Sequence, residues 1–334
     1  MDSEKFPAVE TGVNSAGAVY GRPAALPVSS DDPAQQEIIA GLSAPQAAVA
    51  PKYFYDARGS RLFEMITALP EYYPTRTERE IFAAHAADIA AVAGTGATLI
   101  DLGAGNCAKA ASLFPTLQPL QYVAVDISTD FLRRALERLR PAFPGIEMRA
   151  VGADIYPAPQ LPDTVRRSRR LFFYPGSSIG NFTPDEALRF LTNLRVQCDE
   201  TSGLLIGVDL IKPEAVLKPA YDDAFGVTAA FNLNLLRNLN RIIGSDFAAH
   251  DWRHRAFFNA RQSRVEMHLE ARHALRVVWP GGSRRFARGE TIHTENSYKY
   301  RLDAFTALLR QAGFSRARVW ADAQQWFAVC HAAA

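Results

Sequence analysis

The sequence has few cysteines, no long apolar run and almost no net charge. Its 334 residues include only three cysteines, an odd number that lie far apart, so we expect neither a disulfide framework nor a zinc knuckle and favour the reducing cytoplasm. No segment approaches the roughly 18 consecutive apolar residues of a membrane span. The 37 basic and 35 acidic residues leave a net charge of +2, which is too balanced for an electrostatic grip on nucleic acid. The sequence therefore predicts a cytoplasmic protein with neither a membrane nor a nucleic-acid partner.

The sequence also lacks an internal repeat and a recognisable signal peptide. Its first residues are rich in Ala, Gly, Pro and Ser, without a basic region followed by an apolar one, so residues 1–31 are expected to form a flexible tail. Asp32 and Pro33 then match a helix N-cap followed by proline at the first helical position. The remaining length suits roughly two domains of about 150 residues each.

Short apolar runs alternate with helical segments between residues 97 and 211. The runs expected to form strands are 97–101, 120–128, 147–155, the start of 169–182, and 203–211. Strands that alternate with helices form a parallel sheet with right-handed crossovers, and ligands bind beyond the carboxyl ends of its strands. The pattern predicts an α/β domain with helices on both faces of the sheet.

After Lys212 the alternation stops. Residues 213–243 indicate helix and are rich in asparagine. In residues 264–279 apolar and polar side chains alternate, which predicts one antiparallel strand with a buried and a solvated face. Gly281 and Gly282 indicate a turn before a partner strand. The remaining expected elements are that partner strand at 285–300, a helix at 302–314 and closing strands at 315–322 and 324–332.

A glycine-rich loop, Asp-Leu-Gly-Ala-Gly at residues 101–105, follows the first expected strand. Glycines at this place let a ligand approach the backbone at a helix N-terminus. Gly103, Gly105 and Ala108 also match the dinucleotide fingerprint G-x-G-x-x-A. Cys107 stands where many methyltransferase loops carry a third glycine.

Two cofactors suit such a loop, NAD and S-adenosylmethionine. Asp126, at the end of the next strand, suits the ribose hydroxyls of either one. Asp101 lies two residues before the first glycine, where it would repel a pyrophosphate but tolerate a positively charged sulfonium. The expected C-terminal helix and hairpin resemble the sheet of S-adenosylmethionine methyltransferases. We therefore expect a methyltransferase rather than an NAD-dependent oxidoreductase.

Three further segments are candidates for ligand contacts, and each has a simpler alternative. Asp154 ends the third strand and either faces the adenine of the cofactor or is a solvated loop residue. The loop at 174–182 either covers the donated methyl group, with Asn181 as donor and acceptor, or is a turn in which Asn181 caps the next helix. Glu295 and Ser297 point the same way in an extended segment, and their carboxylate and hydroxyl suit an imidazole. Without further evidence, an exposed strand end with solvated side chains is the simpler interpretation of these two residues.

Two clusters are expected to carry no chemistry. His250 and His254 are four residues apart, but no further metal ligand is placed near them, so a surface pair is the simpler interpretation. The four arginines in residues 166–170 indicate a solvated basic turn. No metal site is expected.

Five segments together resemble the histidine N-alpha-methyltransferase family in order and spacing, from about residue 34 to the C-terminus. They are residues 52–76, 101–106, 174–184, 220–232 and 293–300. The resemblance implies that S-adenosylmethionine is used to trimethylate the α-amino group of L-histidine, through its mono- and dimethyl forms, to hercynine, the first step towards ergothioneine. It also implies a reaction without a metal.

The resemblance further implies two domains. A class I, Rossmann-like methyltransferase sheet with helices on both faces is expected from residues 75–211 and 298–334. A second, α+β substrate domain is expected from the separated segments 32–74 and 212–297. A monomer is expected, since the sequence shows neither a heptad pattern nor an exposed apolar stripe.

Residue roles follow from the resemblance, motif by motif. The implied cofactor contacts are Tyr55, Gly103, Lys109, Asp126, Asp154 and Ile155. The residues expected to act on the reacting amine are Phe63, Tyr72, Gly176 and Asn181. The implied substrate-binding residues are Asn181 and Tyr221, for the α-amino and carboxylate groups, and Tyr72, Met267, Glu295 and Ser297, around the imidazole.

Positioning, rather than a strong general base, is the expected source of catalysis, and Glu295 is the expected specificity residue. The main alternative is the same reaction on another amino acid, such as tryptophan or a dimethylallyl derivative. Glu295 with Met267 favours an imidazole, whereas an apolar residue at position 295 would favour an indole. A cofactor-binding protein without activity is a third interpretation, which the intact set of predicted contacts disfavours.

Overall fold

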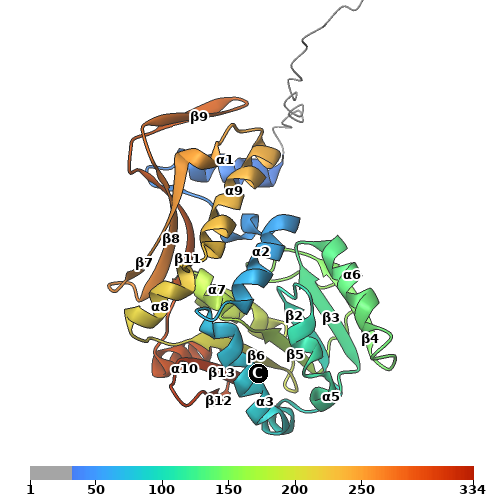
Figure 1. Cartoon of the computed structure of the whole chain (residues 1–334). Helices are drawn as coiled ribbons and strands as arrows, with labels where there is room; N and C mark the ends of the chain where they lie inside the picture. The colour runs from blue at the N-terminus through green and yellow to red at the C-terminus, as the bar shows by residue number, and fades with distance from the viewer. Residues whose placement is uncertain (1–31) are drawn as a thin grey trace, which may run out of the picture.

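A seven-stranded sheet forms the centre of the lower lobe of the molecule (Figure 1). The computed structural model describes residues 32–334, and the tail expected for residues 1–31 lies outside the described residues. The strand order is β12-β13-β6-β5-β2-β3-β4, and only β13 runs antiparallel to the others. The strands are β2 (Thr98–Leu102), β3 (Gln121–Asp126), β4 (Glu147–Gly152), β5 (Arg170–Tyr174), β6 (Gly203–Asp209), β12 (Arg316–Ala321) and β13 (Phe327–Ala333). The predicted α/β sheet and its closing hairpin are confirmed.

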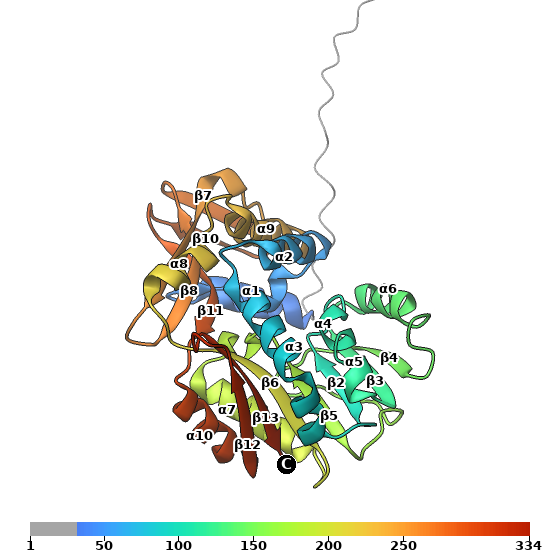
Figure 2. The ribbon, with the colours of Figure 1, turned by 60° about the horizontal axis from the view of Figure 1, so that its bottom comes forward.

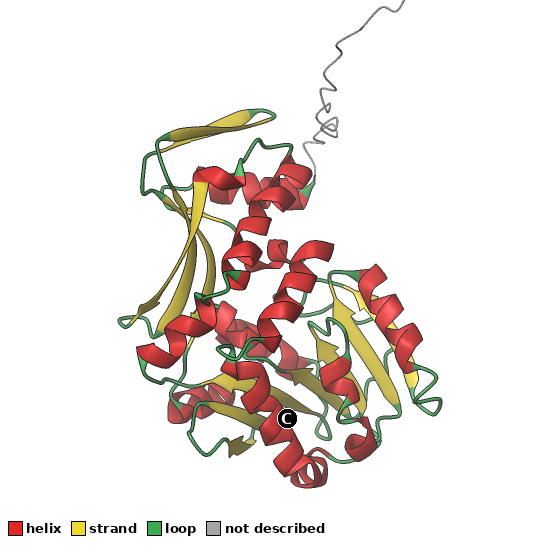
Figure 3. Ribbon diagram, viewed as in Figure 1, coloured by secondary structure: helices red, strands yellow, loops and turns green. Residues whose placement is uncertain are grey.

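Helices cover both faces of this sheet, as the alternation predicts. Every residue of β2, β5 and β6 is buried, which explains their continuous apolar runs. One face packs against α7 and α10, and the other against α3 to α6 (Figure 3). These helices are α3 (Tyr73–Ala93), α4 (Ala108–Ala111), α5 (Phe114–Leu117), α6 (Thr129–Leu139), α7 (Pro184–Val196) and α10 (Leu302–Gln311).

A second lobe is built from the first described residues, beginning with α1 at Pro33, and from a later segment. Its four-stranded sheet has the order β1-β11-β8-β7, and a two-stranded sheet pairs β10 with β9. The strands are β1 (Ala47–Ala48), β7 (Trp252–Asn259), β8 (Arg264–Ala271), β9 (Leu275–Trp279), β10 (Gly282–Phe286) and β11 (Thr291–Tyr298). The helices are α1 (Pro33–Ser43), η1 (Pro51–Phe54), α2 (Ala57–Ala68), α8 (Glu214–Tyr221), α9 (Val227–Ile243) and η3 (Ala249–Asp251).

One apolar core joins the two segments of the second lobe. Its buried residues come from 38–73 and 217–292, and α2 lies beside α9 within it (Figures 1 and 2). α1 begins as the sequence predicts, because the Asp32 side chain accepts a hydrogen bond from the Ala34 amide (2.9 Å). We propose that the domain boundaries lie near residues 74, 212 and 297, where the chain passes between this core and those of the seven-stranded sheet. No helix among residues 32–334 is both long and apolar enough to cross a membrane.

The single half-buried strand predicted over 264–279 is wrong in two respects. The structure has two strands there, β8 and β9, which pair with β11 and β10 in different sheets. The polar face of β8 is also buried, since Glu266, His268 and Glu270 are at most 8% exposed. Neighbouring strands supply partners for this face, including Arg253 from β7 on Glu270 and the His293 ring from β11 on His268. The polar alternation therefore marks an ion-paired face and not a solvated one.

Two smaller predictions also need correction. His250 and His254 are not a surface pair: His250 lies exposed in η3, whereas His254 in β7 is buried and contacts the Tyr221 carbonyl oxygen (2.8 Å). The basic turn at 166–170 is solvated except for Arg170, which opens β5 and donates to the carbonyl oxygens of Arg166 and Gln197.

Gly59 allows the close turn that carries two residues of the site, Tyr55 and Phe63. The Asp56 carboxylate begins α2 by accepting a hydrogen bond from the Gly59 amide (2.7 Å). A Cβ at residue 59 would lie 1.8 Å from the Phe54 carbonyl oxygen, so no side chain fits between η1 and α2.

Gly59→Ala should therefore lower the free energy of unfolding by about 1–3 kcal/mol, because the backbone must shift to admit the methyl group. Chemical denaturation would measure this. Gly145→Ala is the matched control, since a Cβ there meets no atom within 4 Å and should change stability by less than about 0.5 kcal/mol. Equal losses in the two variants would contradict the close-contact argument.

Candidate active site

A cavity lies where the loop after β5 meets the second lobe. About 530 Å³ of space inside it, open mouth included, is not filled by protein atoms. Its walls come from the η1–α2 region and the start of α3, from the loop after β5 with η2 (Ser178–Asn181), and from α8, α9, β8 and β11. The lining residues are Tyr55, Phe63, Ile66, Tyr72, Gly176, Ser177, Ser178, Asn181, Ala220, Tyr221, Thr228, Phe231, Met267, Glu295 and Ser297.

The structure brings all the predicted catalytic and substrate-binding residues to this one cavity. They come from segments up to 234 positions apart, from Phe63 to Ser297. Gly180 makes the assembly possible, since a Cβ there would lie 2.9 Å from the Tyr298 carbonyl oxygen and would push η2 away from β11. The roles of the individual residues stay predictions.

Aromatic rings form one wall of the cavity. Phe63 contacts Tyr55, Tyr72 and Phe231, with ring centroids 5.6, 6.3 and 6.0 Å apart. Aromatic faces attract cations, and sets of them recognise quaternary ammonium groups. The sequence analysis missed Phe231, although it lies in one of the quoted segments, because an apolar helix residue is indistinguishable from a core residue in the pattern.

A β-bulge turns the Glu295 side chain into the cavity. His293 pairs with His268 on β8, and Glu295 pairs with the next β8 residue, Met267, so Thr294 is the extra residue. Without the bulge, His293 and Glu295 would share a face, because side chains alternate along a strand. The bulge places the His293 ring outside, stacked on His268, and Glu295 beside Met267 inside.

The Glu295 carboxylate has no hydrogen-bond or ion-pair partner among residues 32–334. Water reaches the carboxylate through the cavity, although the group lies deep among protein atoms. This burial raises the pKa of Glu295 to about 7, while the charge of Lys299 acts to lower it. A partner for the Glu295 carboxylate must therefore come from the cavity, from water or from a bound ligand. Tyr221 and Ser297 lie nearby with their hydroxyl oxygens 2.7 Å apart.

Lys299 and Asp209 form a buried ion pair behind these two hydroxyls. The Lys299 ammonium contacts Tyr221 Oη (2.8 Å), Ser297 Oγ (2.7 Å) and Asp209 Oδ2 (2.7 Å). The sequence analysis missed both residues. Lys299 is two positions after Ser297, so the alternation of a strand predicts that the two side chains lie on the same face. Asp209 ends an apolar strand, and nothing in the sequence around it indicates its role.

Glu78 of α3 connects the loop after β5 to Lys109. Its buried carboxylate accepts a hydrogen bond from the Gly176 amide (2.7 Å) and another from the Lys109 ammonium. Lys109, a predicted cofactor contact, is therefore directed toward this loop and lies close to Gly176. Glu78 lies two residues after the segment 52–76 that carries the family resemblance, and it is not among the predicted site residues.

Apart from Tyr55, which lines the cavity, the residues expected to hold the cofactor lie at or after the carboxyl ends of β2, β3 and β4. Gly103 and Gly105 have positive φ values of 72° and 51°, and a Cβ on Gly103 would meet no atom within 4 Å, so its outer side is open. Asp126 accepts hydrogen bonds from the amides of Gly105 (3.1 Å) and Ser128 (3.0 Å), one on each oxygen. Each oxygen keeps a free lone pair for a ribose hydroxyl, so the loop and Asp126 fit an adenosyl group.

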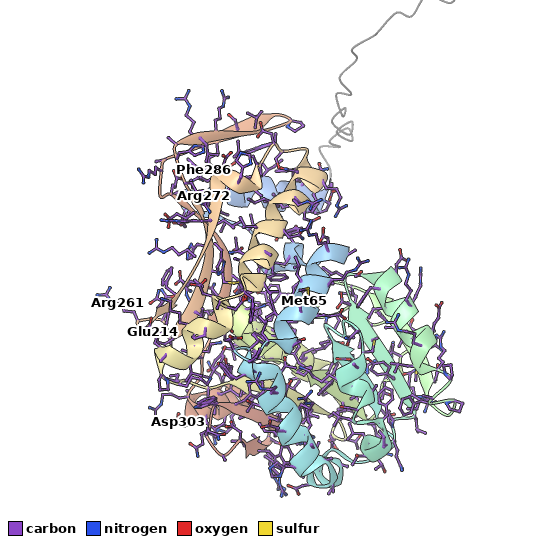
Figure 4. All side chains as sticks on the ribbon, in the orientation of Figure 1. Met65, Glu214, Arg261, Arg272, Phe286 and Asp303 are labelled. Carbon is purple, nitrogen blue, oxygen red and sulfur yellow. The ribbon has the colours of Figure 1, made fainter. Side chains whose placement is uncertain are left out.

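The remaining predicted cofactor contacts are placed less directly. Asp154 is exposed and pairs with Lys52 of the second lobe (3.1 Å), and Ile155 packs at the edge of the core under β4 and β5. Asn106 of the glycine loop donates to Glu64 of α2 (3.1 Å). The next residue of α2, Met65, lies exposed between the two lobes (Figure 4).

Asp101 is turned away from the glycine loop and into the protein. It is 2% exposed and accepts a hydrogen bond from the Tyr122 hydroxyl (2.7 Å). Burial raises its pKa to about 7, so its charge is partial at neutral pH. Its expected repulsion of a pyrophosphate is therefore weaker than the sequence argument assumes.

Glu266, His268 and His293 lie close enough together to be considered as metal ligands, all within 4.8 Å. The two rings stack with centroids 4.8 Å apart and 30° between their planes. Ring nitrogen lone pairs lie in the ring planes, so stacked imidazoles do not converge on one ion. Glu266 already accepts hydrogen bonds from Arg264, Asn259 and His268. We assign no metal to this cluster.

Comparison with known proteins identifies the family of the chain. A family model described as histidine-specific methyltransferase, SAM-dependent, matches residues 34–334. The histidine N-alpha-methyltransferase of Mycolicibacterium smegmatis is 39% identical over 300 residues, which cover 88% of this chain and 92% of that protein. The histidine N-alpha-methyltransferase of Mycobacterium tuberculosis is 38% identical over 294 residues, covering 86% and 91%. Ergothioneine biosynthesis protein 1 of Neurospora crassa is 36% identical over 210 residues, 60% of this chain and 23% of that longer protein.

The raised pKa of Glu295 should make the folded protein less stable as the pH rises from about 4.5 to 7. In that range the folded state keeps a proton that the unfolded state releases, so the free energy of unfolding falls with pH. Glu295→Gln removes this term. At pH 8 the variant should be more stable than the parent by about 2 kcal/mol, after allowing for water in the cavity, and at pH 5 the difference should fall below about 1 kcal/mol.

Denaturant unfolding at the two pH values measures this difference. Asp101, whose pKa is also raised to about 7, is present in both proteins and cancels in the comparison. A stability difference that is the same at pH 5 and pH 8 would show that Glu295 is not buried as described.

Proposed function

Because the chain belongs to the SAM-dependent, histidine-specific methyltransferases, we propose that it trimethylates the α-amino group of L-histidine to give hercynine, the first step towards ergothioneine. The observation that carries the substrate assignment is the unpartnered carboxylate of Glu295, which faces an aromatic-walled cavity together with the Ser297 hydroxyl. An acceptor and a hydroxyl on one strand suit a ring with two nitrogens.

S-adenosylmethionine supplies a methyl group on a positively charged sulfur when it is bound. In our proposal Gly103 admits the cofactor to the backbone of the glycine loop, and Asp126 accepts hydrogen bonds from its ribose hydroxyls. Tyr55, Lys109, Asp154 and Ile155 complete the contacts. The Glu78 carboxylate fixes Lys109 and the Gly176 amide, and so fixes the loop that separates the cofactor edge from the cavity.

Asn181, Phe63 and Gly176 are proposed to hold the α-amino group in line with the donated methyl group. An amine with a pKa near ~8 is roughly one-tenth neutral at pH 7, which costs only about 1.4 kcal/mol. Positioning is worth roughly 7–11 kcal/mol. The cavity therefore needs no strong base, and the amine can lose its proton to water between rounds.

The aromatic wall suits three successive rounds. Each methylation removes an N–H donor, so a carboxylate that bound the ammonium by hydrogen bonds would hold the later intermediates poorly. The faces of Tyr55, Phe63 and Phe231 need no N–H and attract the cation at every stage. The Asn181 amide has no partner among the described residues, so its donor and acceptor both remain for the ligand.

Glu295 is proposed to accept the imidazole N–H, with Tyr72, Met267 and Ser297 around the ring, while Tyr221 and Asn181 hold the other end of the amino acid. Burying this carboxylate without a partner is costly, so amino acids without a matching donor are rejected, by up to about 10⁴-fold. We also retain the predictions that the protein is a cytoplasmic monomer that uses no metal and binds neither nucleic acid nor membrane.

Incubation of the full chain with L-histidine and S-adenosylmethionine, followed by mass spectrometry, tests the proposed function. We expect products that carry one, two and finally three added methyl groups on histidine. A parallel reaction with tryptophan should give no product. Methylated tryptophan with unchanged histidine would replace the substrate assignment while keeping the reaction.

Glu295→Ala should lower the catalytic efficiency with histidine by about 10²–10⁴-fold and leave cofactor affinity within about threefold, because residue 295 faces only the substrate end of the cavity. Asp126→Ala should instead weaken the binding of the cofactor, which calorimetry measures. Asn296→Ala is the matched control, since Asn296 pairs with Glu266 on the opposite face of β11 and does not line the cavity. Retained histidine turnover in Glu295→Ala would contradict the assignment.

A further inference from the structure

The Lys299 side chain is fully buried, with 0% of its surface exposed, and its ammonium is surrounded by three oxygens. These are Tyr221 Oη, Ser297 Oγ and Asp209 Oδ2, at 2.7–2.8 Å. Tyr221 and Ser297 line the cavity, whereas Lys299 and Asp209 do not. Lys299 therefore touches the cavity only through two hydroxyl groups.

An ammonium has three N–H donors and no acceptor, so each of the three oxygens must accept from Lys299. The two hydroxyl oxygens lie 2.7 Å apart, close enough for one of them to donate to the other. Burial raises the pKa of Tyr221 well above its ordinary value, so its hydroxyl keeps its proton. The pair thus has two protons, of which one lies between the oxygens, and the other has no acceptor among residues 32–334.

We propose that Lys299 is a positioning residue that occupies one lone pair on each hydroxyl and so directs the one hydroxyl proton that the Tyr221–Ser297 pair does not share toward the ligand in the cavity. The ligand group that fits is an acceptor, either the unprotonated nitrogen of an imidazole or a carboxylate oxygen. Glu295, on the same face of β11, faces the same cavity with a carboxylate, which accepts hydrogen bonds when it is ionised. This inference rests on the proposed function and assigns a role to a residue outside the cavity wall.

Lys212 provides an unusually close control. Its ammonium contacts the other oxygen of the same carboxylate, Asp209 Oδ1, and also Tyr73 Oη (2.9 Å) and the Leu210 carbonyl oxygen. None of these groups lines the cavity. Burial alone raises the pKa of Asp209, but the charges of Lys299 and Lys212 hold it below its ordinary value.

Lys299→Met and Lys212→Met therefore make the same change to the buried charges. Each removes one of two ammonium groups from Asp209 and leaves one ion pair, and methionine keeps most of the side-chain volume. Unfolding experiments should show comparable losses of stability in the two variants. Only Lys299→Met frees the hydroxyl protons of Tyr221 and Ser297 to turn away from the ligand.

Steady-state kinetics and calorimetry on the full chain test the proposal. We expect Lys299→Met to raise KM and Kd for L-histidine by about 10–100-fold, the loss typical of a hydrogen bond that a charge supports, with a smaller change in kcat and in cofactor affinity. Lys212→Met should remain within about threefold of the parent for histidine. Equal effects of the two substitutions on histidine binding would overturn the proposal.

A variant without the hydroxyls separates positioning from general structural damage. In the Tyr221→Phe/Ser297→Ala background, Lys299 has no hydroxyl to orient, so adding Lys299→Met should weaken histidine binding less than about threefold further. If Lys299→Met lowers histidine affinity as much in this background as in the parent, Lys299 does not act through the two hydroxyls.

Histamine, which has the imidazole but no carboxylate, identifies the accepting group. If Lys299→Met weakens the binding of histamine and of histidine equally, the accepting group is the ring nitrogen. If it weakens the binding of histidine alone, the accepting group is the carboxylate. Both results support the role of the hydroxyl pair as a donor. Failure of the parent protein to bind histidine would contradict the proposed function. If the parent binds histidine, but Lys299→Met and Lys212→Met change histidine affinity equally, only the role of Lys299 is contradicted.

Discussion

The carboxylate of Glu295, buried without a partner, is the constraint on which the rest of the site depends. A group of this kind lowers stability at neutral pH, so the fold must hold it in place against the tendency to turn outward. The bulge at Thr294 does this, because it forces residue 295 to the inner face while the stacked rings of His293 and His268 hold the outer face. Arg264 of β8 also donates to the Tyr298 hydroxyl of β11 (2.6 Å), which helps to keep β11 in that register.

The sequence predicts the main sheet well because its signals are local. Apolar runs that end in Asp126 or in the glycine loop mark strands and ligand edges within a few residues, and the closing hairpin is equally plain. The register of β11 is different. A bulge is one added residue, and the pattern from His293 to Ser297 looks like a simple alternation until the pairing with β8 is known. For the same reason the polar face of β8 was mistaken for a solvated one.

The residues missed at the site share a second physical cause, which is that their partners are distant in the chain. Glu78 meets the Gly176 amide 98 positions away, and Lys299 meets Tyr221 78 positions away. The three apolar cores lie on the two faces of the main sheet and within the second lobe. Contacts across the junction, such as Lys52 with Asp154 and Asn106 with Glu64, are polar and specific in geometry. Apolar periodicity reports cores, so it carries no signal for such a junction.

This division between apolar cores and a polar junction explains how the cavity can distinguish ligands. An apolar pocket separates molecules by volume and tolerates one hydroxyl or methylene with little loss, whereas buried groups of fixed donor or acceptor character do not. In the proposed function Glu295 accepts, and Lys299 directs a hydroxyl proton of the Tyr221–Ser297 pair toward the substrate, so hydrogen-bond polarity defines the substrate end. The amine end must change its own hydrogen bonds three times, and there the chain places aromatic faces and the adaptable Asn181 amide. Repeated methylation of one amino acid requires fixed hydrogen-bond donors and acceptors at the imidazole end, which does not change. At the amine end, which reacts, it requires contacts that accept each methylated form.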